Sequence, residues 1–243
     1  IQNTLQLNNG NNTFSEVAFF GGVAKTDWSW AGLLFDMDND GYRDIFVTNG
    51  VNHDLTDLDF VDFFANEIIQ KMALTGKKQS IDSIINKMPI KPQPNYAYQN
   101  NGDLTFTNAN KDWGFELPSL SNGVAYGDLD NDGDLDLVVN NVNMPLFVYK
   151  NNLDTKASNY LKVVLNGEGL NTNAVGAKVK LTTKTATYFL EQQPARGFQS
   201  SMDNRPNFGF KEKDSLTLTI NWPSGKRTQL QNIEINKTVV LFE

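Results

Sequence analysis

Two short acidic segments hold the residues best suited to chemistry in this 243-residue chain. Residues 36–44 are DMDNDGYRD and residues 128–136 are DLDNDGDLD, so aspartate occupies positions 1, 3, 5 and 9 of both segments and glycine occupies position 6. Four carboxylates so close together would repel one another strongly without a cation. The aspartates are Asp36, Asp38, Asp40 and Asp44 in the first segment and Asp128, Asp130, Asp132 and Asp136 in the second.

Alternate carboxylates in a tight loop can converge on a single ion. Gly41 and Gly133 permit the sharp turn that aims the main-chain carbonyl of position 7, in Tyr42 or Asp134, at the same point. This density of hard oxygen ligands favours Ca²⁺ over soft metals, and Mg²⁺ would keep more of its water than such a cage allows. We therefore predict two Ca²⁺ ions, each bound by four aspartates and one carbonyl, with the Asp134 carboxylate pointing to solvent.

An EF-hand is the main alternative for an aspartate loop of this kind. An EF-hand loop needs a glutamate at position 12, followed by a helix. Position 12 is Val47 or Val139 here, and each lies in an apolar run typical of a strand. The pattern excludes an EF-hand, and a solvated acidic turn poorly explains an arrangement that occurs twice in register.

Composition excludes several other kinds of site. The 21 basic and 28 acidic residues leave a net charge of −7, which argues against nucleic-acid binding. Cysteine is absent and His53 is the one histidine, so disulfides, thiolate nucleophiles and histidine-rich metal centres are excluded. No apolar run approaches the ~18 residues that a membrane-spanning helix needs. The sequence starts at Ile1 without a signal-peptide pattern, so we expect a processed or partial chain.

The acidic segments belong to a longer internal repeat. Asn-Asn-Gly starts at Asn8 in the first copy and at Asn100 in the second, and the whole match keeps this offset of 92 residues as far as Asn49 and Asn141. The alternating and apolar stretches of each copy are typical of short strands separated by turns. A unit of about four short strands is what a propeller blade is built from.

The segment between the copies, residues 51–94, has a helical pattern instead. Thr56 or Asp57 is expected to cap its first helix. We interpret it as a helical insertion in a loop between blades, with its apolar stripe packed on the propeller. The apolar residues at helical spacing are Val61, Phe64, Ile68 and Met72, followed by Ile81, Ile84, Ile85 and Met88.

The last third of the chain predicts a second β domain. Five β-branched or alternating segments are separated by turns that contain glycine, asparagine or proline, a pattern typical of a small sandwich or barrel. The expected strands are residues 160–165, 177–183, 187–192, 216–222 and 238–242.

The aspartate loop that leads directly into a strand resembles the calcium loop of FG-GAP/VCBS repeats, the blades of integrin α-chain-like propellers. The preceding Asn-Asn-Gly and Thr-Phe segments, with Asn49 and Asn141, are similar to that repeat as well. The resemblance implies that the aspartates at positions 1, 3, 5 and 9 and the carbonyl at position 7 bind Ca²⁺ in both copies.

Four motifs near the C-terminus resemble the ASPIC/UnbV domain, which follows VCBS repeats in bacterial surface proteins and in cartilage acidic protein. The family's FGLG-like stretch is Phe208-Gly209-Phe210-Lys211 here, a small departure. This resemblance identifies a module and implies no activity. The motifs are Gly176-Ala177-Lys178-Val179, Gly197-Phe198-Gln199-Ser200, Asn207-Phe208-Gly209 and Trp222-Pro223-Ser224-Gly225.

The sequence thus predicts an all-β protein, in which a partial β-propeller of two calcium-loop blades precedes a small β-sandwich or barrel. The expected blades are residues 1–50 and 95–152, the helical insertion is 51–94, and the ASPIC/UnbV-like domain is 159–243. Two blades cannot close a propeller, which takes roughly four to eight. We therefore expect further blades in a longer chain.

These features favour a non-catalytic, calcium-stabilised binding or adhesion module outside the cytoplasm, because free Ca²⁺ is plentiful mainly outside cells. The module would be secreted, at the cell surface or associated with an outer membrane. Its ligand would be a carbohydrate or another protein. One alternative is a polysaccharide lyase or hydrolase, which would need an acid–base site away from the calcium. The other alternative is a structural spacer of a larger surface protein.

Two further groups of side chains could bind ligands. Three tryptophans could form an aromatic platform for carbohydrate, and four basic residues could bind an anion. We favour packing for the tryptophans and ordinary surface charge for the basic residues. The residues are Trp28, Trp30 and Trp113, and Arg196, Arg205, Lys226 and Arg227.

Overall fold

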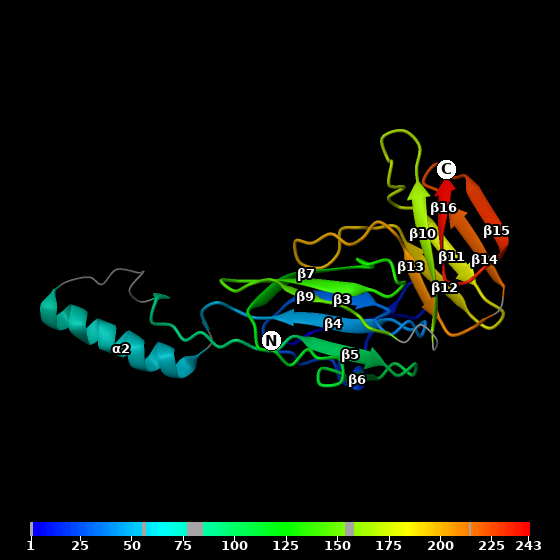
Figure 1. The fold of residues 1–243 in the computed structure, drawn as a ribbon. Coiled ribbons are helices and arrows are strands. Elements are labelled where there is room, and N and C mark those ends of the chain that lie inside the picture. The colour runs from blue at the N-terminus through cyan, green and yellow to red at the C-terminus, as the bar shows by residue number, and fades with distance from the viewer. Residues whose placement is uncertain (1, 55–56, 77–84, 154–157, 214) are drawn as a thin grey trace.

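Strands form the body of the molecule, and one long helix projects from it (Figure 1). The computed structural model describes residues 2–54, 57–76, 85–153, 158–213 and 215–243. It confirms the all-β class, with blade-like sheets in the first part of the chain and a pair of sheets in the last. Within the described residues the blade-like sheets close no barrel.

Two antiparallel sheets correspond to the predicted blades. The first has four strands in the order β3-β4-β5-β6, and the second has three in the order β7-β8-β9. A hairpin of β1 and β2 and a short helix, α1, precede them. The bounds are β1 Gln6–Asn8, β2 Phe14–Glu16, α1 Ala18–Gly21, β3 Ser29–Phe35, β4 Asp44–Asn49, β5 Tyr96–Asn100, β6 Phe106–Asn108, β7 Ser121–Gly127, β8 Asp136–Asn141 and β9 Phe147–Tyr149.

The sequence repeat is also a repeat of backbone geometry. The β3–β4 and β7–β8 hairpins carry a register shift at the same place, and each ends on the aspartate at position 9 of its acidic segment. Phe35 faces Asp44 in the first hairpin and Gly127 faces Asp136 in the second. The acidic segments are therefore the connections within two equivalent pairs of strands, of which the second strand, β4 or β8, is mostly buried.

The boundaries of the sheets do not coincide with the boundaries of the two sequence copies. β5 and β6 open the second copy, yet they complete the sheet of the first, because β5 pairs with β4 through Ile45↔Tyr98 and Val47↔Tyr96. Residues 51–94 therefore connect two neighbouring strands of one sheet, and the expectation of a loop between blades is wrong. Such a long connection is tolerated because the entropy cost of loop closure grows only slowly with loop length.

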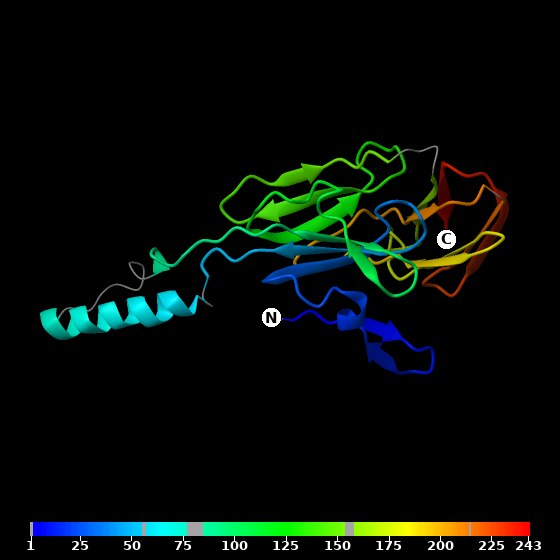
Figure 2. The ribbon, with the colours of Figure 1, turned by 90° about the horizontal axis from the view of Figure 1, so that it is seen from below.

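The helix of this insertion, α2 (Leu58–Thr75), lies apart from the sheets in both views (Figures 1 and 2). Asp57 is its N-cap, as expected, and accepts a hydrogen bond from Phe60 N at 2.9 Å. Gly76, with a φ of 63°, ends the helix. Thr56 and the first half of the expected second helix, with Ile81 and Ile84, lie outside the described residues.

The described part of α2 lies away from the sheets, so the expected packing of its apolar stripe on the propeller is wrong there (Figures 1 and 2). The Phe60 and Phe64 rings instead stack on each other, with their centroids 5.0 Å apart. The Lys87 ammonium, from the segment that follows, lies 4.5 Å from the centroid of the Phe64 ring. Part of the apolar surface of the insertion is therefore covered by contacts between its own side chains.

The C-terminal part is a sandwich of two sheets, as predicted. One sheet has the order β13-β10-β16, with β10 and β16 parallel, and the other is antiparallel with the order β12-β11-β14-β15. Val163 and Phe210 of the first sheet share a fully buried core with Leu181 and Ile220 of the second. The bounds are β10 Asn159–Asn166, β11 Lys178–Thr182, β12 Thr187–Glu191, β13 Asn207–Phe210, β14 Leu216–Asn221, β15 Arg227–Ile233 and β16 Lys237–Phe242.

A second core joins the blades to the sandwich. Leu33 and Phe46 of the first blade and Val139 of the second belong to one cluster, which also contains Met202 and packs against Phe198, both from the segment before β13. The sandwich thus covers apolar faces that two open blades would otherwise expose. None of the described helices is long and apolar enough to cross a membrane.

Candidate metal centres

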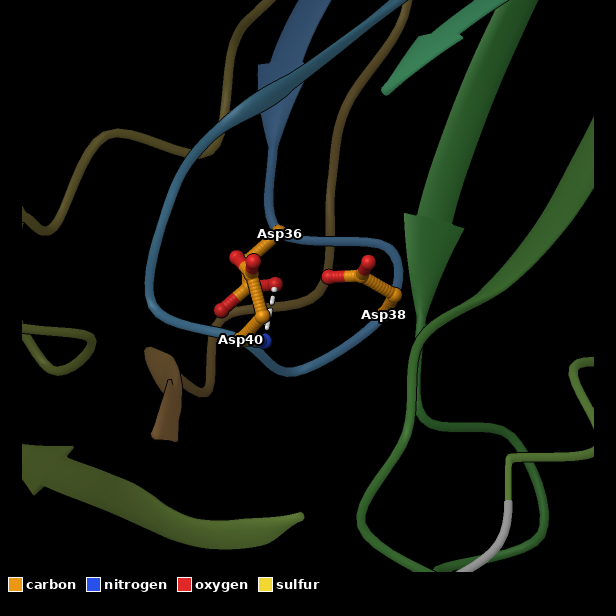
Figure 3. A group of neighbouring side chains, drawn as sticks. All are labelled: Asp36, Asp38 and Asp40. Atoms are coloured by element: carbon orange, nitrogen blue, oxygen red, sulfur yellow. Dashed lines mark hydrogen bonds between the residues drawn. The ribbon is translucent and has the colours of Figure 1, made fainter. Parts of the chain in front are cut away.

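The β3–β4 connection, hereafter the first loop, brings three aspartates together (Figure 3). One carboxylate oxygen from each of Asp36, Asp38 and Asp40 lies within 4.8 Å of the other two. Asp36 holds the loop backbone, because its Oδ1 accepts from Asp40 N at 3.1 Å and its Oδ2 accepts from Gly41 N at 2.9 Å. Asn39 and Gly41 have φ angles of 53° and 93°, a left-handed conformation that these residue types tolerate best.

The carboxylates of the first loop are poorly compensated. Burial raises the pKa of Asp36 to about 8 and that of Asp44 to about 7, and repulsion by neighbouring aspartates adds to both shifts. Burial also raises the pKa of Asp38. Within the described residues the loop has a single ion pair, in which Lys211 Nζ lies 3.3 Å from Asp40.

One oxygen of this cluster has no partner. Asp38 Oδ2 accepts from Gln99 Nε2 at 2.7 Å, whereas the buried Oδ1 of the same carboxylate accepts no hydrogen bond. A buried carboxylate oxygen without a donor costs free energy. A cation at the centre of the cluster would remove that cost.

The β7–β8 connection, hereafter the second loop, repeats this arrangement. One carboxylate oxygen from each of Asp128, Asp130 and Asp132 lies within 4.8 Å of the other two. Gly133 N donates to Asp128 Oδ2 at 3.0 Å, as Gly41 N does to Asp36. Asp128 Oδ1 is buried and accepts no hydrogen bond.

Two lysines distinguish the second loop from the first. Lys162 of β10 is 2% exposed and its ammonium pairs with Asp128. Lys150, just after β9, pairs with Asp130 and lies 3.8 Å from Asp132. The second loop therefore carries positive charge of its own, which a metal ion would have to share or displace.

The aspartates at position 9 hold each loop to the strand beyond it. Each carboxylate accepts one N–H from loop position 2 and one from the chain at or just beyond the end of the next strand. Every oxygen keeps a second lone pair, so metal ligation by these residues stays a prediction. The bonds are Met37 N (2.8 Å) and Asn100 N (2.9 Å) to Asp44, and Leu129 N (2.9 Å) and Asn151 N (2.8 Å) to Asp136.

The carboxylate of Asp134, at position 7, does not point to solvent as expected. The residue is 2% exposed, its Oδ2 accepts from Leu153 N at 3.1 Å, and burial raises its pKa to about 7. Tyr42, at the same position of the first loop, is 52% exposed. The difference arises because the chain after β9 folds back over the second loop. Ligation by the two position-7 carbonyls stays a prediction.

Both loop glycines also make room for tyrosines of the sandwich. A Cβ on Gly41 would lie 2.7 Å from the Tyr188 ring, and one on Gly133 would overlap the Tyr160 ring. Gly209 of β13 approaches the first loop so closely that a Cβ there would collide with Asp36 Oδ2. The two loops are therefore the surface on which the sandwich rests.

Sequence analysis missed the amide and basic side chains around the loops. Gln99 and Lys150 occupy equivalent places, since each contacts the aspartate at position 3 of its loop. A further short repeat in the sequence could have revealed Gln99 and Lys150, because Tyr-Gln-Asn-Asn at 98–101 matches Tyr-Lys-Asn-Asn at 149–152. The signal for Lys162 was a lysine inside an apolar strand, which needs a buried partner.

The tryptophans considered as a carbohydrate platform are held by packing contacts. The Trp30 ring centroid lies 4.8 Å from that of Phe198. Trp113 packs against the core shared by the two blades. These contacts match the interpretation of blade packing for these two residues.

The donor sets of both loops fit a hard divalent cation. Each cluster offers carboxylate oxygens, and each includes a buried oxygen without a hydrogen-bond partner, in Asp38 or in Asp128. Oxygen-only sets of this kind suit Ca²⁺ and Mg²⁺ rather than soft metals. The aspartates at positions 1, 3 and 5 of both loops can therefore hold a metal ion.

Two protein families match the chain, one in each of its two parts. Residues 85–139 match the FG-GAP-like repeat, and residues 167–243 match the family described as ASPIC and UnbV. No curated protein matches the chain. The chain thus combines an FG-GAP-like repeat, typically found in extracellular proteins, with a C-terminal ASPIC/UnbV domain, as the sequence resemblance implied.

Proposed function

We propose that this chain is a non-catalytic, calcium-stabilised module for binding or adhesion outside the cytoplasm. The observation that carries the proposal is the position of the two aspartate clusters, both of which lie where the blades meet the sandwich. A cation in each cluster would join the loop carboxylates and stiffen the surface on which Tyr188 and Tyr160 rest. Calcium would then stabilise the arrangement of domains as well as each blade.

The chemistry of the clusters supports calcium as the ion. The carboxylates at positions 1, 3 and 5 approach one another closely enough to share one centre, and burial raises the pKa of two of them, Asp36 and Asp38 of the first loop. Ca²⁺ accepts six to eight oxygen ligands in flexible geometry, whereas Mg²⁺ demands a near-ideal octahedron. A cage of carboxylates and carbonyls on one short loop suits the larger ion better.

The distribution of carboxyl groups with raised pKa values supports a binding module over a glycoside hydrolase. Among the described residues, each carboxyl group whose pKa is raised belongs to one of the two loops: Asp36, Asp38, Asp44 and Asp134. A glycoside hydrolase typically uses two carboxyl groups, one of them with a raised pKa, in a cleft away from structural calcium. The ligand we propose is a carbohydrate or protein outside the cell.

Calorimetric titration of the chain with Ca²⁺ tests the proposal. Two ions are expected to bind, with a rise in melting temperature that EDTA reverses and that an equal concentration of Mg²⁺ does not reproduce. A glycan and protein array, probed with and without Ca²⁺, tests the binding role. Absence of calcium binding, with no change in the melting curve, would exclude the calcium-stabilised module.

A further inference from the structure

A cavity of about 280 Å³ lies where the first loop, β7 and the sandwich meet. Its lining includes Arg43 of the first loop, Tyr126 of β7 and Arg196 from the segment after β12. These three residues come from three separate parts of the chain, and folding brings their polar groups to one cavity. Its size is close to the lower limit of about 300 Å³ for small-molecule sites, so it suits a ligand of about one sugar ring.

The backbone of β12 positions both guanidinium groups. Arg43 Nη2 donates to the carbonyl of Phe189, and Arg196 Nη2 donates to the carbonyl of Glu191 at 2.9 Å. Arg196 Nε also donates to the Gln193 carbonyl at 2.8 Å. Because β12 is an edge strand, carbonyls two residues apart on its free side hold the two arginines next to each other. Each guanidinium has five N–H donors and keeps several for another partner.

Neither arginine is neutralised within the described residues. Neither forms an ion pair with any described carboxylate, although the chain has a net charge of −7. The acids that line the cavity are engaged or face outward: Asp203 binds Arg205 at 2.8 Å, Asp36 holds the first loop, and Glu191 is exposed. The lining therefore holds three arginines and three acids, and two of those arginines, Arg43 and Arg196, have no carboxylate partner among the described residues.

Tyr126 of β7 lines the same cavity as the two arginines. Its ring is fixed by stacking on Phe35, with the centroids 4.5 Å apart. Tyr126 thus offers a fixed hydroxyl donor beside the two guanidinium groups.

We propose that this cavity binds a carboxylate-bearing sugar, with the carboxylate held by Arg43, Arg196 and the Tyr126 hydroxyl. A guanidinium fork matches a planar carboxylate with two parallel N–H···O bonds. Phe189 and Leu34, which also line the cavity, are 60% and 47% exposed and provide an apolar wall for one face of a sugar ring. This inference rests on the proposed binding function and names the class of ligand that the module takes.

The test is calorimetric titration of the calcium-loaded chain with sodium D-glucuronate. Methyl glucoside, which lacks the carboxylate, and inorganic phosphate, which lacks the ring, are titrated in parallel. Arg196→Gln and Arg43→Gln are each expected to weaken glucuronate binding about 10- to 100-fold, the effect of losing a charge-assisted hydrogen bond. Tyr126→Phe keeps the stacked ring and is expected to weaken binding about 3- to 10-fold.

Arg227→Gln is the matched control, since Arg227 is exposed on β15 and does not line the cavity. Its affinity for glucuronate is expected to equal that of the parent. Equal loss in this control, or phosphate binding as tight as glucuronate binding, would overturn the proposal. Each variant is also titrated with Ca²⁺. If two Ca²⁺ ions bind but glucuronate shows no saturable binding, the proposed class of ligand is wrong and the proposed function stands. If Ca²⁺ does not bind, the proposed function itself is wrong.

Discussion

The two acidic loops have the same pattern of aspartates but different surroundings. In each loop the position-1 aspartate accepts from the glycine N–H and the position-9 aspartate holds the next strand. Lys162 and Lys150 bring two positive charges to the second loop. The first loop meets Gln99 and the backbone of Gly209 at the corresponding places, and Lys211 at its rim.

This difference shows that the aspartate motif determines where the carboxylates lie, whereas the neighbouring domain determines how much of their charge is compensated. At the first loop, burial without compensating charge raises the pKa values of Asp36 and Asp44. At the second, the ammonium of Lys162 already contacts Asp128. We therefore expect the first loop to bind Ca²⁺ more tightly than the second.

Removing calcium from both loops is expected to have the largest effect. At about 1 mM free Ca²⁺ and an affinity of about 10 μM, each ion adds about 2.7 kcal/mol to the free energy of unfolding. Losing both would lower the melting temperature by about 10–20 °C. Scanning calorimetry with and without EDTA measures this shift. An unchanged melting curve, with metal shown to be absent, would contradict it.

Replacing Lys162 tests the cause of the difference directly. Lys162→Met leaves Asp128 buried without its partner, which is expected to cost about 3–5 kcal/mol in calcium-free protein. The same change removes the competing charge, so calcium affinity at the second loop should rise about tenfold. Lys226→Met, which breaks an exposed pair with Glu168, is the control and should change neither quantity. An unchanged affinity for Lys162→Met would show that the lysine does not compete with the ion.

Single substitutions at position 5 separate the two sites. Asp40→Ala and Asp132→Ala are each expected to leave one bound Ca²⁺ of two. Each is expected to lower the free energy of unfolding by up to about 2.7 kcal/mol, with the greater loss for Asp40→Ala. Titration calorimetry counts the ions and chemical denaturation measures stability. Two ions bound with unchanged affinity in either variant would show that the ligand positions are misassigned.

Calcium binding at the first loop is expected to depend on pH. The calcium-free folded state holds protons on Asp36 and Asp44, with pKa values of about 8 and 7, that the unfolded chain releases above a pKa of 3.8. The stability of calcium-free protein should therefore fall as pH rises from about 4 towards 8. Apparent calcium affinity should rise over the upper part of this range, by up to about tenfold per pH unit for each displaced proton. Titration of Asp132→Ala between pH 6 and 8 isolates this loop, and a flat profile would argue against it.

Asp134→Ala is expected to have the smallest effect on calcium binding. The change leaves Leu153 N without its acceptor, at a cost of about 1–3 kcal/mol in unfolding free energy. Two calcium ions should still bind, because the proposed ligand at position 7 is the carbonyl. Asp134→Asn keeps an acceptor for Leu153 N and should recover most of the stability. Loss of an ion in Asp134→Asn would show that the carboxylate itself is a ligand.

The residues that form each aspartate cluster, and the strands on either side of them, could be predicted from the sequence. Aspartates at alternate positions and a glycine at position 6 determine a loop whose carboxylates converge, because the residues involved are adjacent in the chain. The repeat of 92 residues correctly paired the two hairpins, and the alternating segments correctly identified five strands of the sandwich. β13 and β15 escaped notice because glycine in one and polar residues in the other mask their periodicity.

Tertiary structure decided what surrounds those loops. That β5 completes the sheet of β4, that α2 lies away from the blades, and that Lys162 meets Asp128 depend on contacts between residues far apart in the chain. The same is true of the burial of Asp134 and of the meeting of Arg43 with Arg196 in one cavity. Spacing along a chain determines which ligands a loop can offer. Burial and charge around that loop are set by long-range packing, which no local pattern encodes.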